Sequence, residues 1–113
     1  MRIFVRPSAG FPPAAIDLLH KRLEFALGRF AGRVRTLTVR LKDLNGPRGG
    51  ADKHCQISVR LDRPKRVIVI EDVDSQPEAA ITRAAERAAR AVSRAVQVAG
   101  DWRVSNDTAP GWK

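Results

Sequence analysis

The sequence has very few of the residues that build disulfide frameworks or membrane spans. Its 113 residues include a single cysteine, Cys55, and no tyrosine. One cysteine cannot form a disulfide within the chain, which fits a reducing compartment. No apolar run reaches the roughly 18 residues of a membrane span, and the first residues, MRIFVRPSAG, lack the apolar core of a signal peptide. We therefore expect a cytoplasmic protein without a membrane anchor.

Patterns typical of catalytic and metal sites are also missing. His20 and His54 stand alone, without cysteines or a second histidine at metal-ligand spacing. The glycine-rich stretch NGPRGG does not match the GxxxxGK[ST] pattern of a nucleotide-binding loop. Cys55 has the parity of a core residue, and Asp43, Asp52, Asp72 and Asp74 lie near expected strand ends, where turn and capping roles are common. We expect no enzyme, no metal, no cofactor and no small-molecule substrate.

Basic residues are abundant. The chain contains 21 lysines and arginines against 12 acidic residues, which gives a net charge of +9. Such an excess favours a polyanionic partner, with nucleic acid as the first candidate and an anionic membrane surface as the second. A chain of this length fits one domain with a modest core.

Apolar patterns divide the chain into strands and helices. Residues 2–6 alternate charged and apolar side chains, which predicts a short strand. Between Pro13 and Gly32 apolar residues recur every three or four positions, which predicts an amphipathic helix of about five turns. Three runs of strand length follow, and we expect them to form an antiparallel meander whose outer face is polar and basic. These runs are residues 35–44, 53–61 and 66–73.

The last part of the chain is rich in alanine. The run from Pro77 to Gly100 predicts the longest helix, with the proline in its first turn and the glycine at its end. We expect residues 1–100 to form one domain and residues 101–113 to form a mobile tail. The order β-α-β-β-β-α predicts an α+β fold, with two helices packed on one face of a four-stranded sheet.

Four arginines recur along the expected last helix at steps of four, three and four residues. This spacing keeps them within a wedge of about 60° over roughly 16 Å of helix axis. Because Ile81, Ala84 and Ala88 fall on the opposite side, we expect the arginines to point to solvent as an unbroken cationic ridge. Planar guanidinium groups suit phosphate contacts, although an ordinary solvated helix face would give the same pattern. The ridge consists of Arg83, Arg87, Arg90 and Arg94.

The first helix and the glycine-rich loop supply further cations. Phe25 lies on the solvent side of the helix, where it either stacks on a base or packs against the stems of neighbouring side chains. The loop is either a structural turn or a connection that carries its cations to a surface. Besides the ridge and the candidate stacking residue Phe25, the candidate nucleic-acid contacts are Lys21, Arg22, Arg29, Arg33, Arg48 and Lys53.

Two stretches resemble the ribosome hibernation promoting factor family, also described as ribosome-associated translation inhibitors. The first is RLEFALGRFAGRVRTLTVRLKDLNGPRGGADKHCQISVRL, residues 22–61, and the second, looser one is AAITRAAERAARAV in the last helix. The similarity extends over about residues 2–98. It implies a fold like that of double-stranded-RNA-binding domains. It also implies a stress-response protein that occupies the mRNA and tRNA channel of the small subunit in idle ribosomes. In this reading its basic helices contact rRNA phosphates.

We therefore predict a short-form, ribosome-binding translation silencer whose partners are the small ribosomal subunit and its rRNA. Away from the ribosome we expect a monomer. Two alternatives stay open at this point. The same fold could serve as a protein-interaction or regulatory module, which Trp102 and Trp112 of the tail suggest. The chain could also bind duplex RNA generally, without a preference for ribosomes.

Overall fold

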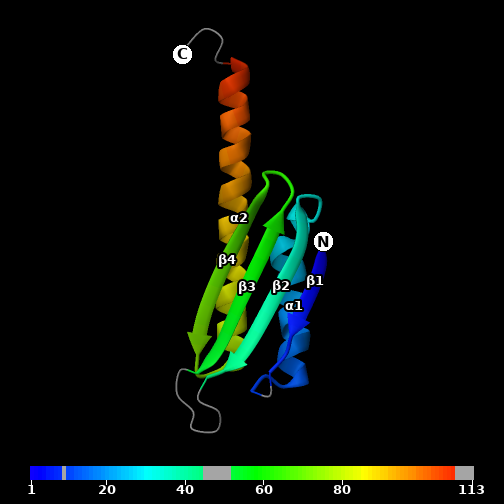
Figure 1. Ribbon diagram of the computed structural model, residues 1–113, viewed down its shortest axis with the longest axis vertical. Helices are drawn as coiled ribbons and strands as arrows, with labels where there is room; N and C mark the ends of the chain where they lie inside the picture. Colours follow the sequence, from blue (N-terminus) through cyan, green and yellow to red (C-terminus); the bar gives the residue numbers. More distant parts are fainter. Residues whose placement is uncertain (9, 45–51, 109–113) are drawn as a thin grey trace.

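The fold is a four-stranded sheet with two helices on one face (Figure 1). The computed structural model describes residues 1–8, 10–44 and 52–108, with the side chains of the last helix described as far as Val98. In chain order the elements are β1 (Arg2–Arg6), α1 (Pro13–Leu27), the 3-10 turn η1 (Gly28–Phe30), β2 (Val34–Asp43), β3 (Lys53–Leu61), β4 (Arg66–Asp74) and α2 (Pro77–Thr108).

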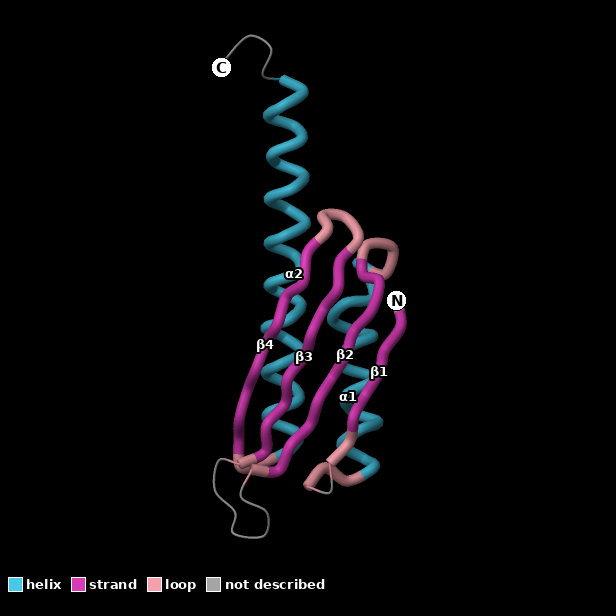
Figure 2. The backbone as a smooth tube through the Cα atoms, viewed as in Figure 1, coloured by secondary structure: helices cyan, strands magenta, loops and turns pink. Residues whose placement is uncertain are grey.

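The strands follow one another across the sheet in the order β1-β2-β3-β4. β1 and β2 run parallel because α1 crosses over between them, whereas β2, β3 and β4 pair antiparallel as a meander. Figure 2 shows both helices behind the sheet and none in front of it. The α+β fold predicted from the sequence is confirmed, including the meander and the single covered face.

The core lies between the sheet and the helices. Alternation along β2 and β3 turns every second side chain toward the helices, and these side chains are buried as predicted. α2 contributes mostly alanines, so its axis can lie close to the strands. The central buried residues are Leu37, Val39 and Leu41 of β2, Cys55, Ile57 and Val59 of β3, Leu19, Leu23 and Leu27 of α1, and Ile81, Ala84, Ala88 and Val92 of α2.

Both helix ends differ from the sequence prediction. α1 ends at Leu27 after 15 residues, about four turns, and the remaining turn to Phe30 is a 3-10 turn. α2 continues past Gly100 to Thr108, so the predicted end at the glycine is wrong. A glycine inside a helix costs only about 1 kcal/mol relative to alanine and does not by itself stop the helix. The predicted tail is thus helical through Thr108, and residues 109–113 lie outside the described part.

No helix in the described part of the chain is long and apolar enough to cross a membrane.

Two residues of α1 provide a matched test of where the core lies. Leu19 is fully buried, whereas Phe25 is 87% exposed. We expect Leu19→Ala to lower the free energy of unfolding by about 2–5 kcal/mol, because it removes buried methyl groups and leaves a cavity. Phe25→Ala should change it by less than about 0.5 kcal/mol. Urea unfolding followed by circular dichroism measures both. Equal losses would contradict this assignment of the core.

Candidate nucleic-acid interface

α1 and α2 lie side by side on the sheet, and two adjoining hollows run between their outer surfaces. One hollow, of about 280 Å³, lies beside Arg22, Phe25 and Arg90. The other, of about 260 Å³, lies beside Arg29, Arg90 and Arg94. Small residues such as Ala26, Ala85 and Ala89 line these hollows, so the long side chains stand at the edges. We call this surface the helix groove and define it by Arg22, Phe25, Arg29, Arg90 and Arg94.

The helix groove is strongly positive. It carries four arginines, and Glu86 is the one acidic residue among its lining side chains in the described part of the chain. Within the described residues, none of these arginines takes part in a salt bridge. Arg29 lies over the ring of Phe30, with its guanidinium carbon 4.7 Å from the ring centre, which holds the side chain without neutralising it. The groove therefore presents uncompensated guanidinium groups suited to phosphate.

Phe25 stands at the edge of the helix groove with 87% of its surface exposed. The solvent-facing position predicted from the helical pattern is confirmed. An aromatic ring this exposed gains little from the core, and it lies beside the hollow that also borders Arg22 and Arg90. The ring is accessible to a flat apolar ligand such as a nucleobase.

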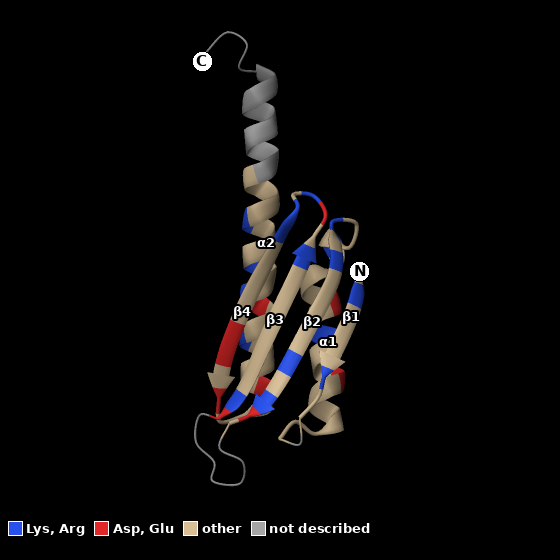
Figure 3. Cartoon of the chain, viewed as in Figure 1, with Lys and Arg blue, Asp and Glu red and all other residues tan. Residues whose placement is uncertain are grey.

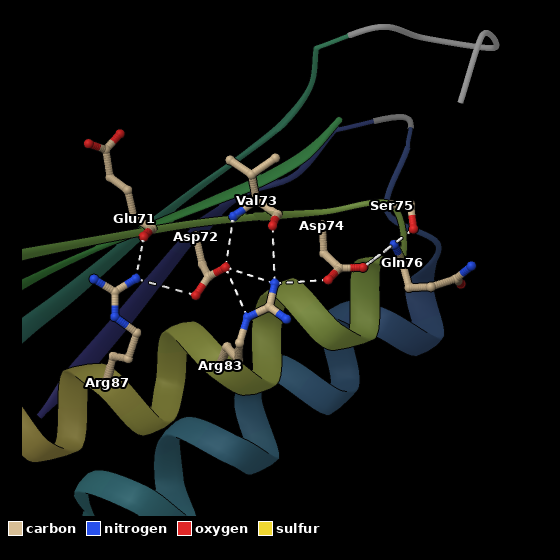
Figure 4. A network of polar contacts seen from close by, with 8 residues as sticks. All are labelled: Glu71, Asp72, Val73, Asp74, Ser75, Gln76, Arg83 and Arg87. Atoms are coloured by element: carbon tan, nitrogen blue, oxygen red, sulfur yellow. Dashed lines mark hydrogen bonds and ion pairs between the residues drawn. The ribbon is translucent and has the colours of Figure 1, made fainter. Parts of the chain in front are cut away.

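The predicted unbroken cationic ridge is wrong for its first half. Arg83 and Arg87 turn toward β4 and pair with its acidic end (Figure 4). Arg83 Nη2 lies 2.9 Å from Asp72 Oδ1 and 2.9 Å from Asp74 Oδ2. Arg87 Nη1 lies 3.3 Å from Asp72 Oδ2 and donates to the carbonyl of Glu71 at 2.6 Å. We call Asp72, Asp74, Arg83 and Arg87 the ion-pair cluster.

The ion-pair cluster shifts the pKa values of its members. Burial raises the pKa of Asp72, but the hydrogen bond and charge of Arg83 and the hydrogen bonds from Arg87 and the backbone of Val73 together lower it by more, so the net pKa lies below the ordinary value. The pKa of Asp74 is also lowered, first by the backbone N–H of Gln76 and then by Arg83. Asp74 Oδ1 accepts that N–H at 2.9 Å and forms an Asx turn just before α2, in line with the turn role predicted for an aspartate at a strand end.

Lys53 does not reach an open surface. This differs from the prediction that its loop carries its cations to a surface. Its side chain is only 14% exposed, and its ammonium lies 3.0 Å from Asp52 Oδ2 and 3.2 Å from Asp43 Oδ1. The hydrogen bond to Asp52 raises the pKa of Lys53, and burial opposes the shift. This lysine neutralises the fully buried Asp52 at the start of β3 and is not available to a polyanion.

The remaining candidate residues either do not line the two hollows of the helix groove or lie outside the described residues. Lys21 is exposed on α1. Arg33 is half-buried and donates from Nη1 to the carbonyl of Arg63 at 3.2 Å, which ties the segment between η1 and β2 to the turn between β3 and β4. Arg48 lies outside the described residues.

Sequence reasoning missed the carboxylates that hold Arg83 and Arg87. The signal was the parity of β4. Asp72 and Asp74 occupy the same alternating positions as Ile68 and Ile70, which turn toward the helices. An acidic residue at such a position needs a cationic partner on the covering helix, and α2 supplies two.

The comparisons with known proteins agree with this architecture. No protein-family model and no curated protein matches the sequence. The solved N-terminal domain of Thermus thermophilus protein Y is similar, with a TM-score of 0.60, 26% identity, and 82% of this chain and 93% of that domain covered. A ribosomal subunit interface protein from Coxiella burnetii shares the fold, with a TM-score of 0.62, 15% identity, and 83% and 96% of the two chains covered. Both match the ribosome hibernation factor family. The resemblance predicted from the sequence is confirmed.

Cys55 provides a test of burial under the ion-pair cluster. It is fully buried opposite Asp72, and burial, followed by the charge of Asp72, raises the pKa of its thiol to about 12. The thiol should therefore stay protonated and unreactive at pH 8, because the thiolate is the nucleophile. Reaction with a chromogenic disulfide reagent should be slow in buffer and complete within minutes in denaturant. Rapid reaction of the folded protein would contradict this placement.

The ion-pair cluster predicts an acid-dependent loss of stability. A carboxylate whose pKa is lowered in the folded state stabilises that state above its unfolded pKa of about 3.9, and this stabilisation is lost as the pH falls through the lower folded value. Asp72→Asn should therefore unfold at lower urea concentration than the wild type at pH 7. The difference should shrink below about pH 4. Asp17→Asn, at an exposed position on α1, serves as the control. A difference that does not depend on pH would contradict the assignment.

Proposed function

We propose that this protein is a ribosome-associated factor that binds rRNA phosphates through the helix groove. The supporting observation is a groove with four arginines and no salt bridge within the described residues, in a chain similar to protein Y and to a ribosomal subunit interface protein. A polyphosphate backbone matches this surface in charge, and its binding relieves the repulsion among the arginines.

In this proposal the protein acts by occupancy and not by chemistry. It lies in the mRNA and tRNA channel of the small subunit in idle ribosomes and excludes the ligands of initiation. It works in the cytoplasm, and it is a monomer away from the ribosome. Arg22, Arg29, Arg90 and Arg94 contact phosphates, and Phe25 stacks on an unpaired base at the edge of the groove. Lys21 adds long-range attraction, whereas Arg83 and Arg87 mainly hold α2 to β4.

Two pairs of arginines on α2 test this division of roles. Arg90→Gln with Arg94→Gln removes two groove charges, and Arg83→Gln with Arg87→Gln removes two charges already opposed by Asp72 and Asp74. Sedimentation with ribosomes at rising salt should give at least about tenfold weaker binding for the groove pair, with the salt slope reduced by about two. The other pair should change the slope less, although it carries the same charge change.

The outcomes separate the competing functions. Equal effects of the two pairs would contradict the assignment of the groove as the contact surface. Failure of the wild type to travel with ribosomes at physiological salt would contradict ribosome binding itself. A duplex RNA competitor should displace the protein only at large excess. Displacement at equal concentration would instead favour a general duplex-RNA binder.

A further inference from the structure

The face of the sheet opposite the helices is not covered by any other described part of the chain (Figure 2). Alternation turns the second set of strand side chains toward this side. Strand pairing arranges them in rows that cross the sheet from β1 to β4. The row at its middle is Phe4, Thr38, Ser58 and Val69, and the row toward the start of β1 is Arg2, Thr36, Arg60 and Val67. We call this surface the open face.

Cations flank the middle row of the open face on both sides. Arg2 and Arg60 lie in one neighbouring row, and Arg6 and Arg40 lie in the other. Lys42 follows one row further along β2. Glu71 is the acidic residue of these rows, and it lies 3.0 Å from His54 Nε2. Figure 3 shows lysine and arginine on all four strands, whereas the acidic residues lie near the ends of β2 and β4 and in the turn between β3 and β4.

The middle row has large apolar side chains at its two ends and small polar side chains at its centre. Phe4 and Val69 are each 50% exposed, and Val67 in the neighbouring row is also exposed. Thr38 and Ser58 lie between them and are small. The row therefore offers an aromatic ring and a shallow polar floor between two cationic rows. The sequence predicts an outer face that is polar and basic. This prediction is incomplete, because the apolar side chains of Phe4, Val67 and Val69 also lie on that face.

The same cationic surface continues into a hollow of about 340 Å³ at the end of the sheet, beside the turn between β3 and β4. Its lining includes Arg60 and Val67 of the open face. Arg35 pairs with Asp62 at 3.5 Å, whereas Arg60, Lys65 and Arg66 make no salt bridge within the described residues. Three uncompensated cations in one hollow suit a phosphate group beside the row that contains Arg60 and Val67.

We propose that the open face is a second nucleic-acid-binding surface, which takes a single-stranded RNA segment with a base on Phe4 and phosphates on the flanking cations. Aromatic side chains on four-stranded sheets can stack on unpaired bases, whose faces a duplex hides. A second copy of this chain fits less well, because two such faces would bring several like charges together. The helix groove lies behind the sheet, so the protein could hold two RNA segments on opposite sides.

The test uses the full chain and a fluorescently labelled single-stranded RNA of about 12 nucleotides. Arg40→Gln with Arg60→Gln removes two open-face charges, and Arg90→Gln with Arg94→Gln is the control with the same charge change in the groove. Fluorescence anisotropy should give the larger loss of affinity for the open-face pair. Phe4→Leu should weaken binding about tenfold, whereas Phe25→Leu should change it less. Thermal unfolding checks that each variant is folded.

A measurement on the wild type removes any dependence on variants. Amide chemical shifts of Thr38 and Ser58 should move on addition of this RNA by more than those of Ala85 and Ala89. Larger shifts on the helix side, or unchanged binding by Phe4→Leu, would overturn the proposal. Equal binding of the annealed duplex, or a dimer of the protein alone that Phe4→Leu dissociates, would also overturn it. The ribosome sedimentation is a separate experiment, so the proposal for the open face is tested independently of the proposed function.

Discussion

The packing of an alanine-rich helix against a sheet determines most features of this molecule. The face of α2 toward the sheet is built largely from alanines such as Ala84 and Ala88, and these are fully buried. Small side chains let the helix lie close to β3 and β4, so that arginines at its edge can reach the carboxylates of β4. Other alanines of the same helix, Ala85 and Ala89, line the space beside α1, which leaves a groove between the two helices. One packing choice thus produces both the ion-pair cluster and the helix groove.

The ion-pair cluster divides the arginines of α2 into two groups with different roles. Asp72 is largely buried and needs a cation, and Arg83 and Arg87 supply it at the cost of their freedom to bind another anion. Arg90 and Arg94 lie beyond the acidic end of β4 and keep their charge for solvent or a ligand. A stripe that is uniform in sequence is therefore divided by what the neighbouring strand places opposite it.

The sheet separates two surfaces of similar charge but different shape. On the covered side, arginines border a groove between helices, with Phe25 at its edge. On the open side, cations lie in rows across a nearly flat surface, with Phe4 among them. A groove favours a ribose-phosphate backbone that enters it, whereas a flat surface with an aromatic ring favours unstacked bases. In the two proposals made above, these surfaces bind RNA on opposite sides of the sheet.

The sequence by itself determined the elements, the core and the fold class, because apolar periodicity at two or at three to four residues depends on local geometry alone. It placed Cys55 and Ile57 in the core and Phe25 at the surface, and the family resemblance followed from contiguous stretches of residues. Tertiary structure alone decided which cations remain free. The charges of Arg83 and Lys53 are neutralised by carboxylates that the folded chain or a strand end places beside them. The spacing of residues along a helix gives no information about these carboxylates. The flanking of Phe4 by cations likewise arises only when strand pairing sets four separate segments in register.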